Sequence, residues 1–305
     1  MKNSLWWLFA FVVLPALCPA QTDSAYIAPL EHQLGIRLYT GQKLLMLTYD
    51  DDNGTERSYL PNSPTNLGIG ISVYNTVISL DLAAGLRFRD KAKYGRTKSF
   101  DFQLHHYNRR FAADVYIQRY KGFYEEQDKT LRLHPDMRVD RYSIHGHYVF
   151  NHRRFSYKAV FAQTERQIRS AGSWLAGAEC YYTKIRSPEP LTNEGYRRAK
   201  NYQIGINGGY AYALALGKYW NLGLAGTVGI AFGNKAFEES DADSFQVYPV
   251  VCPRLSVVYD HNKWALALSY AGSLLFLPTT DEGNVGIHAG QVKFALICRF
   301  GKTKN

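Results

Sequence analysis

The sequence predicts an all-β protein, a single transmembrane antiparallel up-and-down β-barrel of about twelve strands. Three observations support this: an export signal at the start, two-residue alternation of apolar and polar residues, and strand charges confined to one face of that alternation. A bilayer enforces such one-sidedness, because a Lys or Arg at the lipid-facing midplane costs about 2 to 4 kcal/mol. The sheet must also close, since an edge exposed to lipid would leave backbone groups unpaired.

The first twenty residues have the form of a secretory signal peptide. Lys2 supplies a positive end and Leu5 to Leu17 an apolar run, followed by small residues. We therefore expect a cleaved signal over residues 1–20 and one barrel domain over residues 21–305. A retained anchor is the alternative, but the apolar run is shorter than the roughly 20 residues that a spanning helix needs. Lipidation at Cys18 is a further alternative that the residues before it fit poorly.

The remaining cysteines predict neither a disulfide framework nor a metal site. Cys180, Cys252 and Cys298 are an odd number for an oxidising compartment, so we expect isolated thiols. The nearest approach to a zinc pattern, His145 and His147, is an alternating pair with no cysteine beside it. We therefore expect no metal and no cofactor. The net charge of +10 would suit nucleic acid, but an exported chain meets little of it, and lipopolysaccharide phosphates are a more available anionic partner.

Alternation is clearest from Thr76 to Phe88, where aliphatic residues occupy one face while Ser79, Asp81 and Arg87 occupy the other. Similar strands are predicted at about residues 99–105, 111–118, 141–150, 154–161, 202–214, 220–232, 245–259, 264–275 and 291–300. The segment 166–200 is treated as a loop, which gives twelve strands. A strand pair there, around Trp174 to Tyr182, would give fourteen.

Connections alternate between short and long. Short turns are expected near residue 75 and at 108–110, 151–153, 217–218 and 260–263. Longer polar loops are expected at 50–64, 89–98, 122–140, 166–200, 233–244 and 278–290. Bacterial barrels have short periplasmic turns and long outer loops, so we assign the short set and both termini to the periplasm.

Eight charged residues are predicted to point into the lumen: Asp81, Asp101, Asp114, Arg141, Lys158, Arg254, Lys293 and Arg299. The three aspartates lie on consecutive strands, and the cations come from elsewhere around the ring. A bore of about twelve strands is narrow enough for long side chains to meet across it. Because buried charges need partners, we expect a charge-paired plug. A polarised passage for a small solute is the alternative.

An outer-membrane hydrolase of the lipase or protease type is a second alternative. Ser143, His145 and His147 share one strand face, as a nucleophile and its base would require. That face is expected to be the lumen, which a lipid substrate would not reach, and no G-x-S-x-G elbow occurs. We therefore predict no catalytic residues.

Three passages resemble a known family: Tyr59 to Gly70 (YLPNSPTNLGIG), Thr97 to Tyr124 (TKSFDFQLHHYNRRFAADVYIQRYKGFY) and Gln167 to Ser173 (QIRSAGS). Together they are similar to domain of unknown function 4421 (DUF4421), a family of Bacteroidetes-type Gram-negative bacteria, and the middle passage is the most specific. The resemblance covers nearly all of the mature chain. It implies an outer-membrane barrel with no assigned activity. The chain departs from the usual barrel pattern in that the terminal aromatic, Phe300, is followed by a short basic tail.

The sequence thus predicts an integral outer-membrane protein of a Gram-negative bacterium, with a structural or binding role. Expected partners are outer-membrane lipid, lipopolysaccharide and, during biogenesis, the barrel-assembly machinery, and no nucleic acid. Four basic residues of one loop, Lys91, Lys93, Arg96 and Lys98, are candidates for contact with lipopolysaccharide phosphates, with ordinary solvated charge as the alternative.

Overall fold

The computed structural model describes residues 22–30, 32–51, 56–63, 65–73, 76–82, 90–127, 130–191, 195–236, 246–261, 263–280 and 283–302. The predicted signal peptide and Cys18 lie outside these residues.

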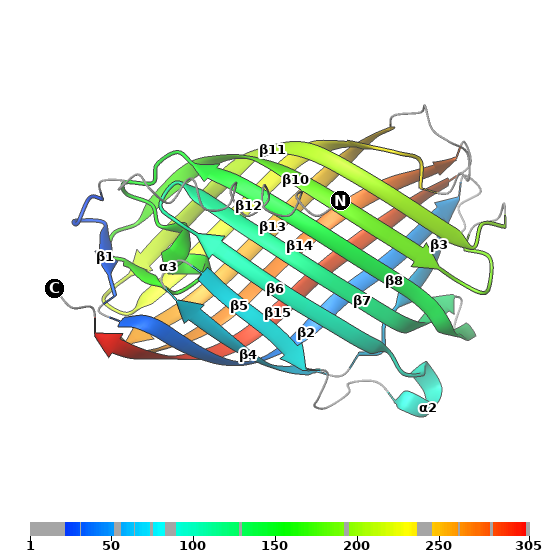
Figure 1. The fold of residues 1–305 in the computed structure, drawn as a ribbon, viewed down its shortest axis with the longest axis horizontal. Helices are drawn as coiled ribbons and strands as arrows, with labels where there is room; N and C mark the ends of the chain where they lie inside the picture. The colour runs from blue at the N-terminus through cyan, green and yellow to red at the C-terminus, as the bar shows by residue number, and fades with distance from the viewer. Residues whose placement is uncertain are drawn as a thin grey trace, which may run out of the picture.

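Twelve antiparallel strands form a closed ring in this part of the chain (Figure 1). In ring order they are β2 (His32–Asp51), β4 (Asn66–Val73), β5 (Thr76–Leu82), β6 (Lys98–Tyr107), β7 (Phe111–Gln127), β8 (Thr130–Val149), β10 (Ala171–Arg186), β11 (Arg198–Leu216), β12 (Trp220–Gly233), β13 (Gln246–His261), β14 (Trp264–Thr280) and β15 (Gly283–Lys302). The last strand, β15, pairs with the first, β2, along almost its whole length and closes the ring. The predicted transmembrane barrel of twelve strands is confirmed.

The ring has two dissimilar ends. At the terminal end, where β2 begins and β15 ends, lie β1 (Ile27–Pro29) and α3 (Tyr157–Phe161) (Figure 1). At the far end lie α2 (Lys91–Tyr94) and β3 (Glu56–Leu60). The short strand β3 bridges the far portions of β2 and β7, beyond the stretch of β2 that β4 covers.

Two of the expected long loops are largely strand. The β7–β8 pairing continues from residue 121 to the pair Gln127 and Thr130, and the β14–β15 pairing continues to Thr280 and Gly283. The expectation of loops over 122–140 and 278–290 is therefore wrong. Polar composition suggested loops, but a hairpin needs only its backbone hydrogen bonds and can carry polar side chains where it meets water.

The segment predicted as a strand over 154–161 is wrong as a strand. It belongs instead to a plug in the lumen, by which we mean the segment between β8 and β10 (residues 150–170). Its alternating apolar residues enter α3, whose N-cap is Ser156, and β9 (Glu165–Gln167) then pairs with β1 at the terminal end of the ring. Over so few residues, alternation does not distinguish a strand from a short helix buried on several sides. The missing strand is supplied by β10, from within the expected 166–200 loop, so the predicted strand number is unchanged.

The plug is held by apolar packing at the terminal end. Phe155, Tyr157 and Val160 are almost fully buried, and they pack in one cluster with inward residues of the wall such as Leu175 and Ala211. The helix also contacts β12 and β13. Burial of an aromatic or aliphatic side chain contributes about 1.5 to 3 kcal/mol, so this cluster fixes the plug against the wall.

The far half of the lumen is mainly apolar, although Glu125, His134, Thr183 and Asn201 are also buried there. A second cluster gathers inward residues from both sides of the ring, including Leu47, Met137, Ile185, Tyr248 and Ile287, each at most 3% exposed. Most inward positions here carry aliphatic or aromatic side chains, as the two packed faces of a core do.

The outward face is also apolar, but exposed. Ile206, Val228 and Trp174 are 63%, 65% and 68% exposed, and similar residues occur on every strand of the ring. The described part of the chain holds no helix with the length and hydropathy needed to cross a bilayer.

Gly122 gives a test of the wall geometry. It lies at the register shift in β7 with a φ of 91°. A Cβ added there would lie 2.4 Å from the backbone oxygen of Arg96. We expect Gly122→Ala to lower the stability of the barrel by about 1 to 3 kcal/mol, measured as the denaturant midpoint in detergent micelles. The control is Gly226→Ala in β12, where an added Cβ meets nothing within 4 Å. Equal denaturant midpoints for the two variants would contradict the register shift at Gly122.

Candidate functional site

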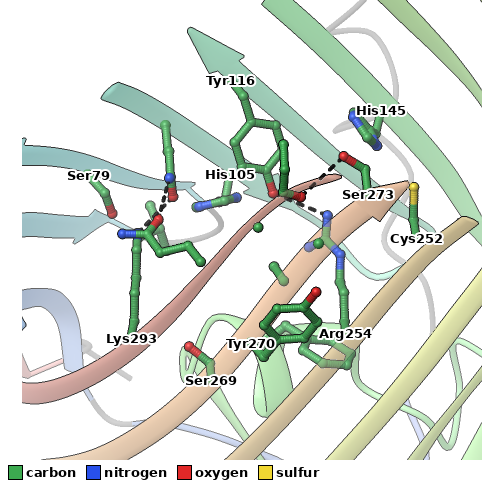
Figure 2. Close-up of a pocket in the computed structure, with 18 of the residues that line it drawn as sticks. Ser79, His105, Tyr116, His145, Cys252, Arg254, Ser269, Tyr270, Ser273 and Lys293 are labelled. Carbon is green, nitrogen blue, oxygen red and sulfur yellow. Dashed lines mark hydrogen bonds between the residues drawn. The ribbon is translucent and has the colours of Figure 1, made fainter. Parts of the chain in front are cut away.

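Polar side chains fill the middle of the lumen, between the plug and the apolar far half. They surround a cavity of about 120 Å³ (Figure 2). Figure 2 shows Tyr116, Arg254 and Lys293 reaching this cavity from different strands. Pockets for small molecules usually start near 300 Å³, so this volume suits a few waters rather than a solute.

Asp114 and Arg254 form the central pair. Asp114 on β7 is fully buried, and its Oδ2 accepts a hydrogen bond of 2.5 Å from Arg254 Nη2 on β13, on the opposite wall. Tyr107 donates to Asp114 Oδ1, and His105 Nδ1 lies 2.5 Å from the same oxygen. Arg254 also donates to the hydroxyls of Tyr107 and Tyr116. The carboxylate thus has three partners, as a charge removed from water requires.

Asp101 on β6 belongs to a separate group. Its two carboxylate oxygens accept from Gln103 and Gln118, and Lys43 Nζ lies 3.5 Å away. Gln103 Oε1 in turn accepts from Lys293 Nζ at 2.7 Å. Asp101 and Asp114 therefore lie on neighbouring strands but bind different cations.

Two arginines from the first and last strands fix the end of α3. Arg37 on β2 donates to Ala162 O and to Gln163 Oε1. Arg299 on β15 donates to Gln163 O at 3.0 Å and makes two hydrogen bonds to Asp260. We call Arg37 and Arg299 the latch arginines, because they join the plug to the strand pair that closes the ring.

Glu165 organises the plug itself. Its Oε1 lies 2.8 Å from both Lys158 Nζ and Arg109 Nη2, and its Oε2 accepts from Ser156 Oγ. Burial lowers the pKa of the Lys158 ammonium, and the charge of Glu165 opposes that shift. Gln167 adds four hydrogen bonds that hold the turns on either side.

The eight residues predicted for the lumen thus fall into several groups. Lys158 was expected on a strand, and it lies instead on α3, because the plug replaces that strand. Arg141 donates to Ser273 Oγ across the lumen and lies over the ring of Tyr181. The side chain of Asp81 lies outside the described residues, although its backbone pairs in β5.

Ser143, His145 and His147 face the lumen and are at most 4% exposed. No hydrogen bond joins the serine to either histidine in the described part of the chain. Their position inside a packed barrel gives no support to a lipid hydrolase.

One cluster in the described residues has donors of the kind that bind zinc. A ring nitrogen of His145, a carboxylate oxygen of Glu179 and the sulfur of Cys252 all lie within 4.8 Å of one another, and all three residues are buried. Histidine, thiolate and carboxylate ligands are common for that ion. Sequence spacing gave no sign of this group, because Cys252 lies on β13, which is three strands round the ring from the β10 strand of Glu179.

The four basic residues considered for lipid contact lie on and beside α2 at the far end. Lys91, Lys93, Arg96 and Lys98 are all exposed, and Lys93 lies over the ring of Tyr94. The structure records no partner that would distinguish a lipid-binding role from solvated charge.

Residues missed from the sequence include Arg37, His105, Tyr107, Glu179 and Asp260. Alternation carried the signal for His105 and Tyr107, since both share the inward face of β6 with Asp101. The alternation gave no signal for the residues that contact the plug, because those contacts exist only once the plug segment has entered the ring.

Breaking the central pair tests the buried charge network. We expect Asp114→Asn or Arg254→Met alone to cost about 3 to 5 kcal/mol, because each leaves a buried charge without its partner. The double variant should cost less than the sum of the two. Denaturant unfolding in micelles measures all three. Asp136→Asn, which breaks an exposed pair with Lys121, should leave the midpoint almost unchanged. Additive costs would contradict the pairing.

Comparison with solved structures finds bacterial barrels at low similarity. The translocator domain of autotransporter NalP from Neisseria meningitidis matches with a TM-score of 0.44 and 12% identity, covering 97% of this chain and 95% of that chain. The P. putida toluene transporter TodX has a TM-score of 0.31 and 6% identity, covering 89% and 91%. OmpT, an outer membrane protein of Vibrio cholerae, has a TM-score of 0.27 and 9% identity, covering 85% and 97%. These values support no inference about activity.

No curated protein matches the sequence. A family model does match residues 21–300, which is nearly the whole chain beyond the expected signal peptide, and it bears the description domain of unknown function (DUF4421). The sequence resemblance is therefore confirmed, and this barrel with its filled lumen belongs to the DUF4421 family.

Proposed function

We propose that the protein is an integral outer-membrane barrel with a sealed lumen, and that it has a structural or binding role at the membrane. The observation that carries this proposal is the filling of the lumen by three successive layers. From the terminal end they are the plug, the polar middle and the apolar far half.

Two aromatic bands on the outward face support the membrane location. Near the terminal end, Trp174 packs on Tyr210, and Trp220 and Trp264 pack on Tyr259. Toward the far end, Tyr142, Tyr182 and Tyr202 stack side by side. Along β10 the two bands are about 26 Å apart at 3.3 Å per residue, or about 20 Å along the axis for a strand tilted by 40°. This is close to the roughly 25 Å apolar band of outer-membrane barrels.

The orientation is part of this proposal, and the short turns at the terminal end support it. We place the terminal end in the periplasm and the far end outside, as in bacterial barrels generally. The partners in this proposal are membrane lipid and lipopolysaccharide, with the assembly machinery acting during insertion.

The channel alternative has less support. A passage would have to pass the latch arginines and α3, cross a cavity of about 120 Å³, and then part an apolar layer whose central side chains are at most 3% exposed. A hydrolase has less support still, because Ser143 and both neighbouring histidines point into this packed interior.

Conductance in planar lipid bilayers tests the sealed lumen. We expect no steady conductance from the wild-type protein. We also expect none from the double variant Arg37→Ala with Arg299→Ala, because loosening the plug leaves the apolar far half in place. A steady open state of the wild type would contradict the proposal. A steady open state of the double variant alone would show that the plug is the sole seal, and would contradict the role of the apolar layer.

A further inference from the structure

A cluster of cations lies on the outward wall near the far end. It consists of seven residues on four neighbouring strands, which we call the basic belt: Arg119, Lys121, Arg138, Lys184, Arg186, Arg198 and Lys200. The alternation places them outward, because the intervening residues Tyr120, Val139, Ile185 and Ala199 are buried in the apolar lumen. These strands, β7, β8, β10 and β11, run side by side in Figure 1.

The strand register stacks like charges directly opposite one another. Arg138 faces Lys121 on one side and Arg186 on the other, and Arg186 in turn faces Arg198. One step toward the middle of the barrel, Lys184 faces Lys200. Like charges in opposed positions destabilise a sheet, so a bound anion would stabilise this arrangement.

The chain itself compensates part of this charge with two aspartates. In the strand register, Asp140 faces Arg119 on one side and Lys184 on the other. Asp140 binds Arg186 at 2.8 Å, and Asp136 binds Lys121 at 2.7 Å. In the residues that the structure describes, Arg138, Lys184, Arg198 and Lys200 have no carboxylate within ion-pair distance. Seven cations against these two aspartates leave an excess of positive charge on one face of the wall.

A tyrosine row and an apolar groove lie immediately below the belt. Tyr142, Tyr182 and Tyr202 stack at 5.8 Å and 4.7 Å between ring centroids, and Arg119 donates to the hydroxyl of Tyr142. Below them the outward wall is hollowed by a groove of about 670 Å³, whose lining includes Val115, Ile117, Ile144, Cys180, Ile204 and Phe232. Tyrosine rings favour the membrane–water boundary, so the groove faces acyl chains while the belt lies at headgroup level.

We propose that the basic belt and the groove form a binding site for a phosphorylated acyl lipid of the outer leaflet, of the lipid A class. The arginines and lysines bind its phosphate groups, and the groove takes one of its acyl chains. Guanidinium groups bind phosphate through paired hydrogen bonds, and each basic side chain near a membrane surface adds attraction for anionic lipid. The inference rests on the proposed membrane location, and it assigns a ligand to a surface distinct from the α2 loop.

The test titrates the detergent-solubilised, folded protein with bis-phosphorylated lipid A and follows binding by native mass spectrometry. The variant Lys184→Gln/Arg186→Gln/Arg198→Gln/Lys200→Gln removes four belt charges. The matched control, Lys91→Gln/Lys93→Gln/Arg96→Gln/Lys98→Gln, removes the same charge at the same end of the barrel. Dephosphorylated lipid A, phosphatidylethanolamine and inorganic phosphate are the comparison ligands.

We expect the belt variant to bind lipid A at least about tenfold more weakly than wild type, and the α2 variant to stay within about twofold. Cys180→Trp, which fills the groove, should also weaken binding. Equal loss in both charge variants would contradict the site, as would equal wild-type binding of dephosphorylated lipid A or phosphatidylethanolamine. Inorganic phosphate competing as well as lipid A would contradict the role of the groove.

Stability separates a lost ligand from a lost fold. Without lipid A, the belt variant should unfold at the same or a higher denaturant concentration than wild type, since it loses opposed like charges. If it fails to fold, Lys184→Gln/Lys200→Gln makes the same test with two charges. A folded, non-conducting barrel that does not retain lipid A contradicts the belt site alone. Failure to insert into bilayers contradicts the proposed function.

Discussion

The pairing of β15 with β2 is the constraint on which the rest of the structure depends. It joins the two ends of the sheet along almost its whole length, so the described ring has no open edge. Closure in turn gives every strand one inward and one outward face. The outward face must be compatible with lipid, and the inward face must fill a bore of fixed width. The latch arginines arise from these same two strands, so the plug is attached where the ring closes.

Filling that bore takes different chemistry along the axis. At the terminal end a segment between β8 and β10 enters the ring and packs as a small apolar core. In the middle, inward side chains are polar and charged. Asp101 and Asp114 each have a cation and several hydrogen bonds there, and the buried carboxylate of Glu179 accepts from Asn207. In the far half the wall packs directly against itself. The arrangement resembles a protein interior wrapped in a lipid-compatible shell, and it supports anchoring or surface binding more than transport.

The sequence predicted the features that depend on alternation. It identified the barrel, the strand number, the outward apolar stripe and the inward direction of Asp114 and Arg254, because each follows from period two. It could not predict α3, since Phe155 to Phe161 alternates like a strand over too short a distance. It also could not predict the apolar far lumen. Inward Leu47 or Ile185 looks like any other strand hydrophobe until the ring shows which face it takes. The register that opposes Lys184 and Lys200 likewise appears only with the pairing.

Two native cysteines test the central claim that one face of the wall meets lipid while the other is sealed. Cys252 is 6% exposed and lines the lumenal cavity, whereas Cys180 is exposed on the outward groove. The measurement is thiol modification of the folded protein in lipid vesicles by a charged maleimide and by a lipid-soluble one, resolved by peptide mass spectrometry. We expect Cys180 to react with the lipid-soluble reagent and Cys252 with neither until the protein is unfolded. Rapid modification of Cys252 by the charged reagent would show a lumen open to water and contradict the account.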